Sequence, residues 1–334
     1  MKPKILAIES SCDETSASVI VGGEVLSNII AGQKIHEKYG GVVPELASRE
    51  HQKHIIPVVM AALDEANISL QELDAIAFTR GPGLLGALLV GVSFAKSLAL
   101  ALDIPLIEVN HMQAHVLAHF IDKPCPAFPF LCLTVSGGHT QIVLVKDYLQ
   151  MEVIGQTQDD AVGEAFDKTA KLLGLPYPGG PLIDKYAQKG NPRAYEFAKT
   201  EMPELDFSFS GIKTSILYFL QKKTKENPNF IEENLADICA SVQHNLVEML
   251  MQKLRKASKE THIKEIAIAG GVAANSGLRK TLQQEAQKKG WKVYIPDFQH
   301  CTDNAAMIAI AGHYKYLQGE FCSQNVGALA RWNL

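Results

Sequence analysis

The sequence predicts an α/β protein built from two similar lobes that face each other across a cleft. Its 334 residues exceed the size at which one hydrophobic core usually stops growing, which favours two domains. Two segments, 4–21 and 129–145, share one pattern: an apolar run, a small polar turn and a second apolar run. Because helical and strand patterns alternate after each of them, a duplicated α/β domain is the simplest explanation.

The first lobe is expected to span 1–128 and to begin with a β-hairpin, KILAIESSCDETSASVIV, over 4–21. Alternating helices and strands follow it, namely a helix over 43–68, a strand over 74–81, a largely buried helix over 84–102 and a strand over 105–109. The C-terminal segment, about 305–334, is expected to pack back on this lobe.

The second lobe is expected to span 129–304 and to begin with the hairpin PFLCLTVSGGHTQIVLV over 129–145. Its further elements are a helix over 160–175, a loop rich in proline and glycine over 175–184, a long helix near 232–259 and a strand over 265–271. Ligands of such folds bind where strand ends open into a crevice, so the two hairpin turns are expected to line the site.

Composition excludes few functions. The net charge of -4 neither indicates nor excludes RNA binding, because a local basic face can exist on an acidic protein. The six cysteines form no CxxC pair, which indicates reduced thiols. The apolar run near the N-terminus is interrupted by Glu9, and the longest charge-free apolar stretch, 81–95, is shorter than the ~18 to 20 residues of a membrane span. We therefore expect a cytoplasmic protein without a membrane segment.

Two glycine-containing turns are candidate ligand sites. The segment EIAIAGGVAANSGLR (265–279) is a strand that ends in Gly-Gly before a helix, and it matches neither the dinucleotide fingerprint nor the P-loop. SGGHT (136–140) could expose backbone N–H groups to a phosphate or carboxylate, or could be glycine-rich only to form a hairpin.

A third candidate is the turn of the first hairpin. It carries two adjacent acidic residues, Asp13 and Glu14, which could hold a cation or could simply be solvated.

The histidines of NHMQAH and the nearby His119 could form a metal site, although a pair of histidines at this spacing also arises by chance in a chain with 11 histidines. A spacing of four residues puts neighbouring histidines on one helix face, but eight residues of helix rise about 12 Å, too far for one ion to bind all three. Asn110 is a good helix N-cap, which places His111 in the first turn and modestly favours the pair His111 and His115. Met112 occupies the position where an HExxH peptidase has its catalytic glutamate, so a peptidase lacks its general base.

A polar turn and a small-residue helix are predicted over CTDNAAMIAIAGHY (301–314). Thr302 or Asp303 is expected to cap that helix. An acidic residue there could instead complete a site of two histidines and one carboxylate. Sequence spacing leaves both alternatives open.

The whole chain resembles the TsaD family of tRNA threonylcarbamoyladenosine transferases, once called glycoproteases. The motifs that carry this resemblance are, in chain order, IESSCDETS, YGGVVPELASREH, TRGPGLLGAL, KSLALALDIPLIEVNHMQAHV, VSGGHTQI, FDKTAKLLGLPYPGGPLID, FSFSGIKT, AGGVAANSGLR and CTDNAAM. The resemblance implies a two-lobed actin-like, Hsp70-like and sugar-kinase-like (ASKHA) fold of duplicated RNase H-like domains. It also implies transfer of a threonylcarbamoyl group from threonylcarbamoyl-AMP to N6 of the adenosine 3′ of the anticodon, in tRNAs that read ANN codons.

Site residues follow from the same resemblance. The metal ligands are expected to be His111, His115 and Asp303, with Fe(II) favoured and zinc as an alternative ion. The adenylate, or ATP, ADP or AMP in its place, is expected to bind at Thr134, Val135, Ser136, Gly137, Gly138, Asp167, Gly180, Asp184 and Asn275. We assign Asp13 and Glu14 to orienting or deprotonating the tRNA amine. His119 lies outside the family's pattern and is expected on the helix surface or behind the ligands.

The resemblance further implies several partners besides tRNA. These are a TsaB-like pseudo-paralogue that forms a heterodimer with the chain, a TsaE-like ATPase, and a TsaC-like synthase that supplies the adenylate. Two other functions compete with the transferase: a non-catalytic, nucleotide-binding actin-like scaffold, and a metallopeptidase. The complete metal triad argues against the scaffold, and Met112 argues against the peptidase.

Overall fold

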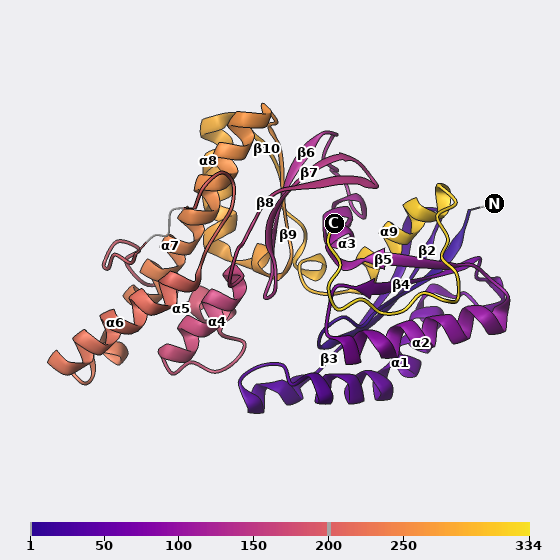
Figure 1. Ribbon diagram of the computed structural model, residues 1–334, viewed down its shortest axis with the longest axis horizontal. Helices are drawn as coiled ribbons and strands as arrows, with labels where there is room; N and C mark the ends of the chain where they lie inside the picture. Colours follow the sequence, from indigo (N-terminus) through magenta and orange to yellow (C-terminus); the bar gives the residue numbers. More distant parts are fainter. Residues whose placement is uncertain (1, 199–201) are drawn as a thin grey trace. The chain divides into compact units, whose positions relative to one another are not determined.

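Two five-stranded sheets form the framework of the protein, one in each of two units (Figure 1). The computed structural model describes residues 2–198 and 202–334. The chain ranges of unit 1 are Met1–Cys125, Asp147–Met151 and Pro296–Leu334, and those of unit 2 are Pro126–Lys146 and Glu152–Ile295. The segment 296–304, expected in the second lobe, therefore belongs with unit 1, where His300 contacts Asp122 at 3.1 Å.

The sheet of unit 1 has the strand order β3-β2-β1-β4-β5. Its strands are β1 (Lys4–Glu9), β2 (Glu14–Val21), β3 (Glu24–Gly32), β4 (Ala75–Gly81) and β5 (Leu106–Asn110). β1 pairs antiparallel with β2, which confirms the predicted hairpin, and parallel with β4. Strand β3, which was not predicted from the sequence, is the partly exposed edge strand of this sheet.

Helices cover both faces of this sheet. They are α1 (Pro44–Ala66), α2 (Leu85–Leu102), α3 (His111–Leu117) and α9 (Ala305–Leu317), with short 3₁₀ helices η1 (Lys34–Tyr39), η2 (Leu70–Glu72), η3 (Ala118–Phe120) and η5 (Phe298–His300). Side chains alternate along β1, so Leu6 and Ile8 pack on α1 and α2, whereas Ile5 and Ala7 pack on α3 and α9. This alternation explains why β1 is apolar at every position from 5 to 8.

Among the described residues, α2 is the one helix long and apolar enough to cross a membrane by length and composition. The predicted apolar stretch ended at Ala95 because Lys96 follows, but the helix continues to Leu102. Val92 and Ala95 of α2 pack into the core with β1 and α1, and Lys96 donates a hydrogen bond to the carbonyl oxygen of Val326. These contacts are those of a core helix in an α/β unit.

Unit 2 repeats the topology of unit 1. Its strand order is β10-β9-β6-β7-β8, with β6 (Phe130–Val135), β7 (Thr140–Asp147), β8 (Gln150–Gln156), β9 (Glu265–Ala269) and β10 (Lys292–Tyr294). As in unit 1, the first strand β6 pairs antiparallel with the second and parallel with the fourth. The same order in both sheets confirms the duplication that the two hairpin patterns predicted.

The helices of unit 2 include three that the sequence patterns located and two that they missed. They are α4 (Val162–Leu172), α5 (Gly179–Ala187), α6 (Ser210–Glu226), α7 (Phe230–Thr261) and α8 (Ser276–Lys289), with a 3₁₀ turn η4 (Gly271–Ala274) before α8. The prediction of a loop over the whole of 175–184 was wrong, because α5 begins at Gly179 directly after Pro178. Proline and glycine there terminate a loop and start a helix.

Candidate active site

Asn110 fixes the start of the helix that carries the two histidines. β5 ends at Asn110, and its side-chain oxygen accepts hydrogen bonds from the backbone N–H groups of Met112 at 2.9 Å and Gln113 at 3.2 Å. The predicted N-cap is therefore confirmed. It places His111 in the first turn of α3 and His115 one turn later on the same face.

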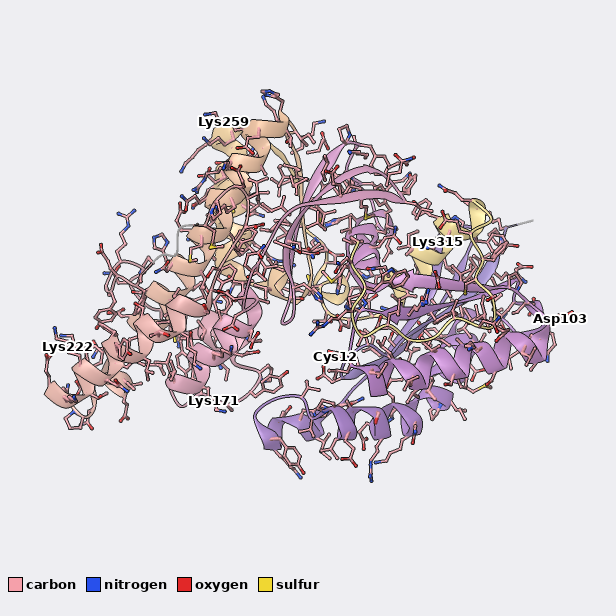
Figure 2. The ribbon with its side chains drawn as sticks, in the orientation of Figure 1. Cys12, Asp103, Lys171, Lys222, Lys259 and Lys315 are labelled. Atoms are coloured by element: carbon pink, nitrogen blue, oxygen red, sulfur yellow. The ribbon has the colours of Figure 1, made fainter. Side chains whose placement is uncertain are left out.

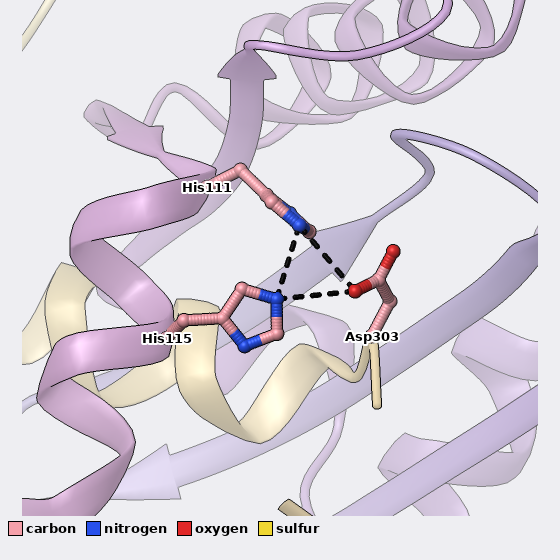
Figure 3. Close-up of side chains that lie close together, drawn as sticks. All are labelled: His111, His115 and Asp303. Carbon is pink, nitrogen blue, oxygen red and sulfur yellow. Dashed lines mark hydrogen bonds and ion pairs between the residues drawn. The ribbon is translucent and has the colours of Figure 1, made fainter. Parts of the chain in front are cut away.

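His111, His115 and Asp303 converge in unit 1 (Figure 3). The two Nε2 atoms are 3.2 Å apart, and Oδ1 of Asp303 lies 3.1 Å from Nε2 of His115 and 3.4 Å from Nε2 of His111. Three donors that each lie about 2.0 to 2.1 Å from one ion, at angles near 90° to 109°, are roughly 3.0 to 3.4 Å apart. The triangle therefore has the size that a single metal ion requires.

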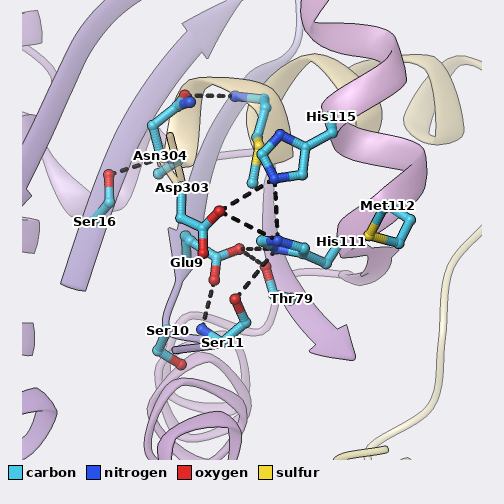
Figure 4. A network of polar contacts seen from close by, with 12 residues as sticks. Glu9, Ser10, Ser11, Ser16, Thr79, His111, Met112, His115, Asp303 and Asn304 are labelled. Atoms are coloured by element: carbon cyan, nitrogen blue, oxygen red, sulfur yellow. Dashed lines mark hydrogen bonds and ion pairs between the residues drawn. The ribbon is translucent and has the colours of Figure 1, made fainter. Parts of the chain in front are cut away.

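The helix cap next to Asp303 explains why this carboxylate is available. Neither Thr302 nor Asp303 caps α9, contrary to the capping prediction: Asn304 does so, accepting from the N–H of Met307 at 3.1 Å. The first N–H of α9, that of Ala305, donates to Oγ of Ser16 at 2.8 Å. Because other groups satisfy the helix start, Asp303 points to the histidines instead (Figure 4).

A buried carboxylate lies behind His111. Oε2 of Glu9, at the end of β1, is 3.1 Å from Nδ1 of His111, whereas the other ring nitrogen, Nε2, faces Asp303 and His115 (Figure 4). The same carboxylate accepts hydrogen bonds from the N–H of Ser11 and the hydroxyl of Thr79, each at 2.5 Å. In the sequence, Glu9 stood out only as an interruption of an apolar run.

The pKa values of His111, Glu9 and Asp303 are set by the charges that these three side chains place on one another. Burial alone would lower the pKa of His111, but the Asp303 and Glu9 carboxylates outweigh it and raise this pKa well above its usual value. Burial would raise the pKa values of Glu9 and Asp303, but the charge of His111 and its hydrogen bonds hold both below their usual range. A positive charge is thus strongly favoured between these carboxylates, as a metal site requires.

Asp13 and Glu14 lie in the turn between β1 and β2, and Glu14 is the first residue of β2. Burial raises the pKa of Glu14 well above its usual value, and the negative charges of Asp303 and Asp13 raise it further. Glu14 is therefore close enough to Asp303 for their charges to interact. A carboxylate whose pKa is raised in this way binds a proton more readily than an ordinary carboxylate does.

Two other histidines of unit 1, His51 and His119, are buried. His51 of α1 received no role, but it is buried and its two ring nitrogens contact Oγ1 of Thr15 at 2.8 Å and the carbonyl oxygen of Cys12 at 3.0 Å. Burial lowers the pKa of His51. His119 is 7 % exposed and lies in η3, so it is not a surface residue.

The predicted adenylate-binding acids join the helices of unit 2. Asp167 of α4 accepts hydrogen bonds from the N–H groups of Gly179 at 2.9 Å and Gly180 at 3.0 Å, and burial raises its pKa. Asp184 of α5 accepts from the N–H and the hydroxyl of Ser276 at 3.1 and 2.6 Å. Each carboxylate has lone pairs left for a further donor such as a ribose hydroxyl.

Asn275 is mainly a helix cap in this structure. Its Oδ1 accepts from the N–H of Leu278 at 2.9 Å, and its Nδ2 donates to Oε1 of Gln243 at 2.8 Å. Thr134 and Val135 are completely buried in β6. A ligand would therefore meet the neighbours of Thr134 and Val135 and not these two residues, whereas Asn275 keeps one N–H for an additional bond.

Three predicted glycines are not required by the fold. A Cβ added at Gly137 or Gly138 would meet no atom within 4 Å, and at Gly180 the nearest atom is 3.8 Å away. None of the three has a positive φ. The alternative that SGGHT needs glycine for its backbone angles is therefore wrong for these two positions. By contrast, Gly163 of α4 packs so tightly on the SGGHT turn that a Cβ would lie 2.5 Å from the carbonyl oxygen of Ser136.

Comparisons with known proteins decide the family. The family model described as TsaD, tRNA N6-adenosine threonylcarbamoyltransferase, matches residues 24–310. The chain belongs to the TsaD family. A relative of that name from Cytophaga hutchinsonii is 65% identical over 96% of this chain and 94% of its own length, and one from Christiangramia forsetii is 62% identical over 99% and 98%.

More distant relatives extend the same result. A TsaD family member from Clostridium botulinum is 54% identical over 99% of this chain and 97% of its own length. Solved structures that share the fold alone include component A of (R)-2-hydroxyglutaryl-CoA dehydratase from Acidaminococcus fermentans, with a TM-score of 0.55 and 13% identity over 95% of this chain and 98% of that chain. Full-length HypF has a TM-score of 0.64 and 14% identity over 94% of this chain and 46% of that chain. The actin-like ASKHA fold is thereby confirmed.

Proposed function

We propose that this chain transfers the threonylcarbamoyl group of threonylcarbamoyl-AMP to N6 of the adenosine 3′ of the anticodon, in tRNAs that read ANN codons. Membership of the TsaD family supports the reaction class and tRNA as the acceptor. The observation that carries the proposal for this chain is the convergence of His111, His115 and Asp303 at distances suited to one ion. A family member that had become a scaffold would have no reason to keep this triangle.

The adenylate of the donor binds in unit 2. Asp167 and Asp184 accept hydrogen bonds from the ribose hydroxyls, or they position backbone groups that bind the ribose. The remaining N–H of Asn275 donates a hydrogen bond to the ligand. The open space at Gly137, Gly138 and Gly180 lets the ligand approach the main chain. ATP, ADP or AMP can occupy the same positions, because they share the adenosine that these residues contact.

His111, His115 and Asp303 hold one divalent cation, with iron favoured and zinc as the alternative. Two imidazoles and one carboxylate are typical of Fe(II) sites with open coordination positions, and zinc accepts the same ligands. A cation with open positions supplies Lewis-acid stabilisation of negative charge on an oxygen of the donor. The protein's part is to direct Nε2 of both histidines at one point, where the two atoms lie 3.2 Å apart.

In the transfer, the N6 nitrogen of adenosine forms a bond to the carbamoyl carbon, and the bond from that carbon to the phosphate oxygen breaks. AMP leaves with the bonding electrons, and the nitrogen loses one proton. Glu14 is the acceptor of this proton, with Asp13 orienting the amine, because the raised pKa of Glu14 makes it a stronger base than an ordinary carboxylate. The donor is already an activated anhydride, so positioning and charge stabilisation account for most of the catalysis.

The chain works with other proteins in the cytoplasm. Its partners are a TsaB-like pseudo-paralogue in a heterodimer, a TsaE-like ATPase and a TsaC-like synthase that delivers the adenylate. Exposed apolar side chains on α1 and α2, among them Ile56, Met60 and Leu89, offer a surface for the heterodimer. The donor is a mixed anhydride that water can hydrolyse, which explains a dependence on its supplier.

The test is a reconstituted transfer. The chain is combined with its three protein partners, threonine, bicarbonate, ATP and an unmodified tRNA, and the digested tRNA is analysed by mass spectrometry for threonylcarbamoyladenosine. We expect the modified nucleoside with the wild type and none with His111→Ala. Absence of the product with the wild type, or full activity of His111→Ala, contradicts the proposal. Proteolysis by the purified chain that disappears in His111→Ala would instead revive the peptidase.

A further inference from the structure

We propose that Glu9 is a positioning residue of the metal centre, which holds the Nδ1–H of His111 so that Nε2 is free to bind the ion. Glu9 is completely buried, and its Oε2 lies 3.1 Å from Nδ1 of His111. Asp303 and His115 contact the other ring nitrogen, Nε2 (Figure 4). This proposal concerns how the metal ligand is oriented and rests on the proposed metal site.

The physical reason is the tautomer of the imidazole. A neutral imidazole carries one proton, on either Nδ1 or Nε2, and only the unprotonated nitrogen can bind a metal ion. A carboxylate accepting from Nδ1 keeps the proton there and makes Nε2 a better donor. The hydrogen bonds from Ser11 and Thr79 hold the Glu9 carboxylate in place, so the ring is fixed through two layers of contacts.

The burial of Glu9 supports a function beyond folding. A carboxylate without solvent is costly unless donors and a positive charge surround it, and β1 is otherwise a strand of apolar core residues. His115 has no equivalent acceptor: among the described residues its buried Nδ1 makes no hydrogen bond. Control of the tautomer is therefore built into His111 alone.

The test uses Glu9→Gln, which keeps the size of the side chain and removes its charge. We expect the affinity for Co²⁺, titrated into metal-free protein and followed by visible absorption, to fall about 10- to 100-fold, with an altered spectrum. Glu285→Gln is the matched control, because it removes another buried carboxylate, one that pairs with Arg255 in unit 2. It should leave Co²⁺ binding unchanged.

Thr79→Val keeps the test decisive if Glu9→Gln does not fold. It retains the Glu9 carboxylate but removes one of its donors, so we expect a smaller loss of Co²⁺ affinity, of several-fold, with the fold intact. Thermal unfolding with a chelator reports folding independently of the metal. Wild-type Co²⁺ affinity and spectrum in folded Glu9→Gln, or in Thr79→Val where the first variant fails to fold, would overturn the proposal.

We also infer, from independent observations, that one face of α6 binds the tRNA backbone. The chain as a whole is acidic, but the charge is uneven: the ranges of unit 1 contain 11 basic and 18 acidic residues, and those of unit 2 contain 21 and 18. The net charge of unit 2 is therefore positive and that of unit 1 negative, so a polyanion is attracted to unit 2. Within unit 2, α6 has four lysines and one glutamate, and α8 has an equal balance of one arginine, three lysines and one glutamate, but of the two helices only α6 also carries an exposed aromatic side chain, Tyr218.

The face is defined by Tyr218, Lys222 and Lys225, which we call the α6 face. Lys222 and Lys225 follow Tyr218 by four and seven residues, so the three share one side of the helix. Tyr218 is 65% exposed, and both lysines are exposed. Figure 2 labels Lys222. Within residues 2–198 and 202–334, neither lysine forms an ion pair with an acidic side chain, whereas Lys223 pairs with Glu226.

Lysines beside an exposed aromatic ring suit a nucleic acid strand. Ammonium groups neutralise phosphates, and an exposed ring stacks on an unpaired base, as found in many single-strand binding sites. An acidic protein partner would be attracted by the lysines alone and would not need the ring. The inference rests on tRNA being the acceptor of the proposed function. Its test measures binding of tRNA and not transfer, so a negative result can be told apart from a failure of the transfer reaction.

The experiment measures the affinity of the chain for unmodified tRNA, with its TsaB-like partner present, as a function of salt concentration. Removing one ammonium group that neutralises a phosphate should reduce the slope of log K against log salt by about one, so Lys222→Gln with Lys225→Gln should reduce it by about two. Tyr218→Ala should weaken binding about tenfold with less change in slope. Lys213→Gln is the control, because Lys213 lies five residues before Tyr218, on another side of α6.

An unchanged slope in the Lys222 and Lys225 double variant, or an equal change in Lys213→Gln, would overturn the inference. Loss of binding to the TsaB-like partner in the double variant, with tRNA affinity intact, would show that the α6 face is a protein interface instead.

Discussion

Two adjacent glycines at the start of α5 are expected to have different roles: Gly179 allows α5 to pack on α4, and Gly180 leaves space for a ligand. An alanine Cβ at Gly179 would lie 2.2 Å from the Cβ of Ala170, far closer than the usual contact of about 3.5 to 4 Å. We expect Gly179→Ala to force α5 away from α4 and to cost about 1 to 3 kcal/mol in free energy of unfolding. The hydrogen bonds of Asp167 to this turn should weaken with it.

Gly180→Ala should behave in the opposite way. Its Cβ would meet Phe166 at 3.8 Å and Asp167 at 4.0 Å, which is ordinary contact, and alanine is the better helix former by about 0.5 to 1 kcal/mol. The variant should therefore be as stable as the wild type or slightly more stable. If the adenylate approaches the main chain here, the added methyl group should lower its affinity about tenfold or more.

Urea unfolding gives the stabilities, and calorimetric titration with ADP gives the affinities. A Gly180→Ala protein that binds ADP like the wild type would refute the assignment of Gly180 to the nucleotide site. A large loss of stability in Gly180→Ala would refute the steric argument itself.

Three further predictions concern unit 1. Asn110→Ala removes the cap that accepts from Met112 and Gln113, so urea unfolding of the metal-free chain should show a loss of about 1 kcal/mol; no loss would mean that the cap does not hold α3. Burial lowers the pKa of His51, so the unfolded chain binds this proton more readily; its contribution to stability is complete above the unfolded pKa of about 6.5 and is lost as pH falls through the folded pKa. Unfolding measured from pH 5 to 8 should therefore show a shallower loss of stability in His51→Gln than in the wild type, and equal slopes would contradict the assignment. Because the pKa of Glu14 is raised, the rate of transfer should increase as pH rises through that value, and this limb should disappear in Glu14→Gln; an unchanged pH profile would exclude Glu14 as the base.

Local features of the sequence were enough to predict much of the fold. The two hairpins follow from apolar runs around small polar turns, and the cap at Asn110 follows from a polar residue between a strand and a helix. Each involves residues close together in the chain. The loop predicted over 175–184 failed because proline and glycine are equally typical of a loop and of a helix start, and only the packing of Gly179 on α4 distinguishes them.

The site depends on long-range contacts that the sequence pattern does not reveal. Asp303 is 188 residues from His115, and without the family resemblance its proposed role as a ligand could not be separated from that of a helix cap. Glu9 looked like a defect in an apolar strand, because its partner His111 comes 102 residues later. His51 lies among polar residues of α1, and only its buried contacts with Thr15 and Cys12 show that it holds the β1–β2 turn.

The central claim is that transfer requires a metal ion held by His111, His115 and Asp303. The most direct measurement removes the metal with a chelator, restores Fe²⁺ in steps, and records bound iron and threonylcarbamoyladenosine formed in the same samples. We expect activity of the wild type to rise in proportion to iron up to one ion per chain, and Asp303→Asn to bind little iron and remain inactive. Asp297→Asn, an exposed aspartate of the same segment, should match the wild type. Full activity of the metal-free chain, or of Asp303→Asn, would contradict the account.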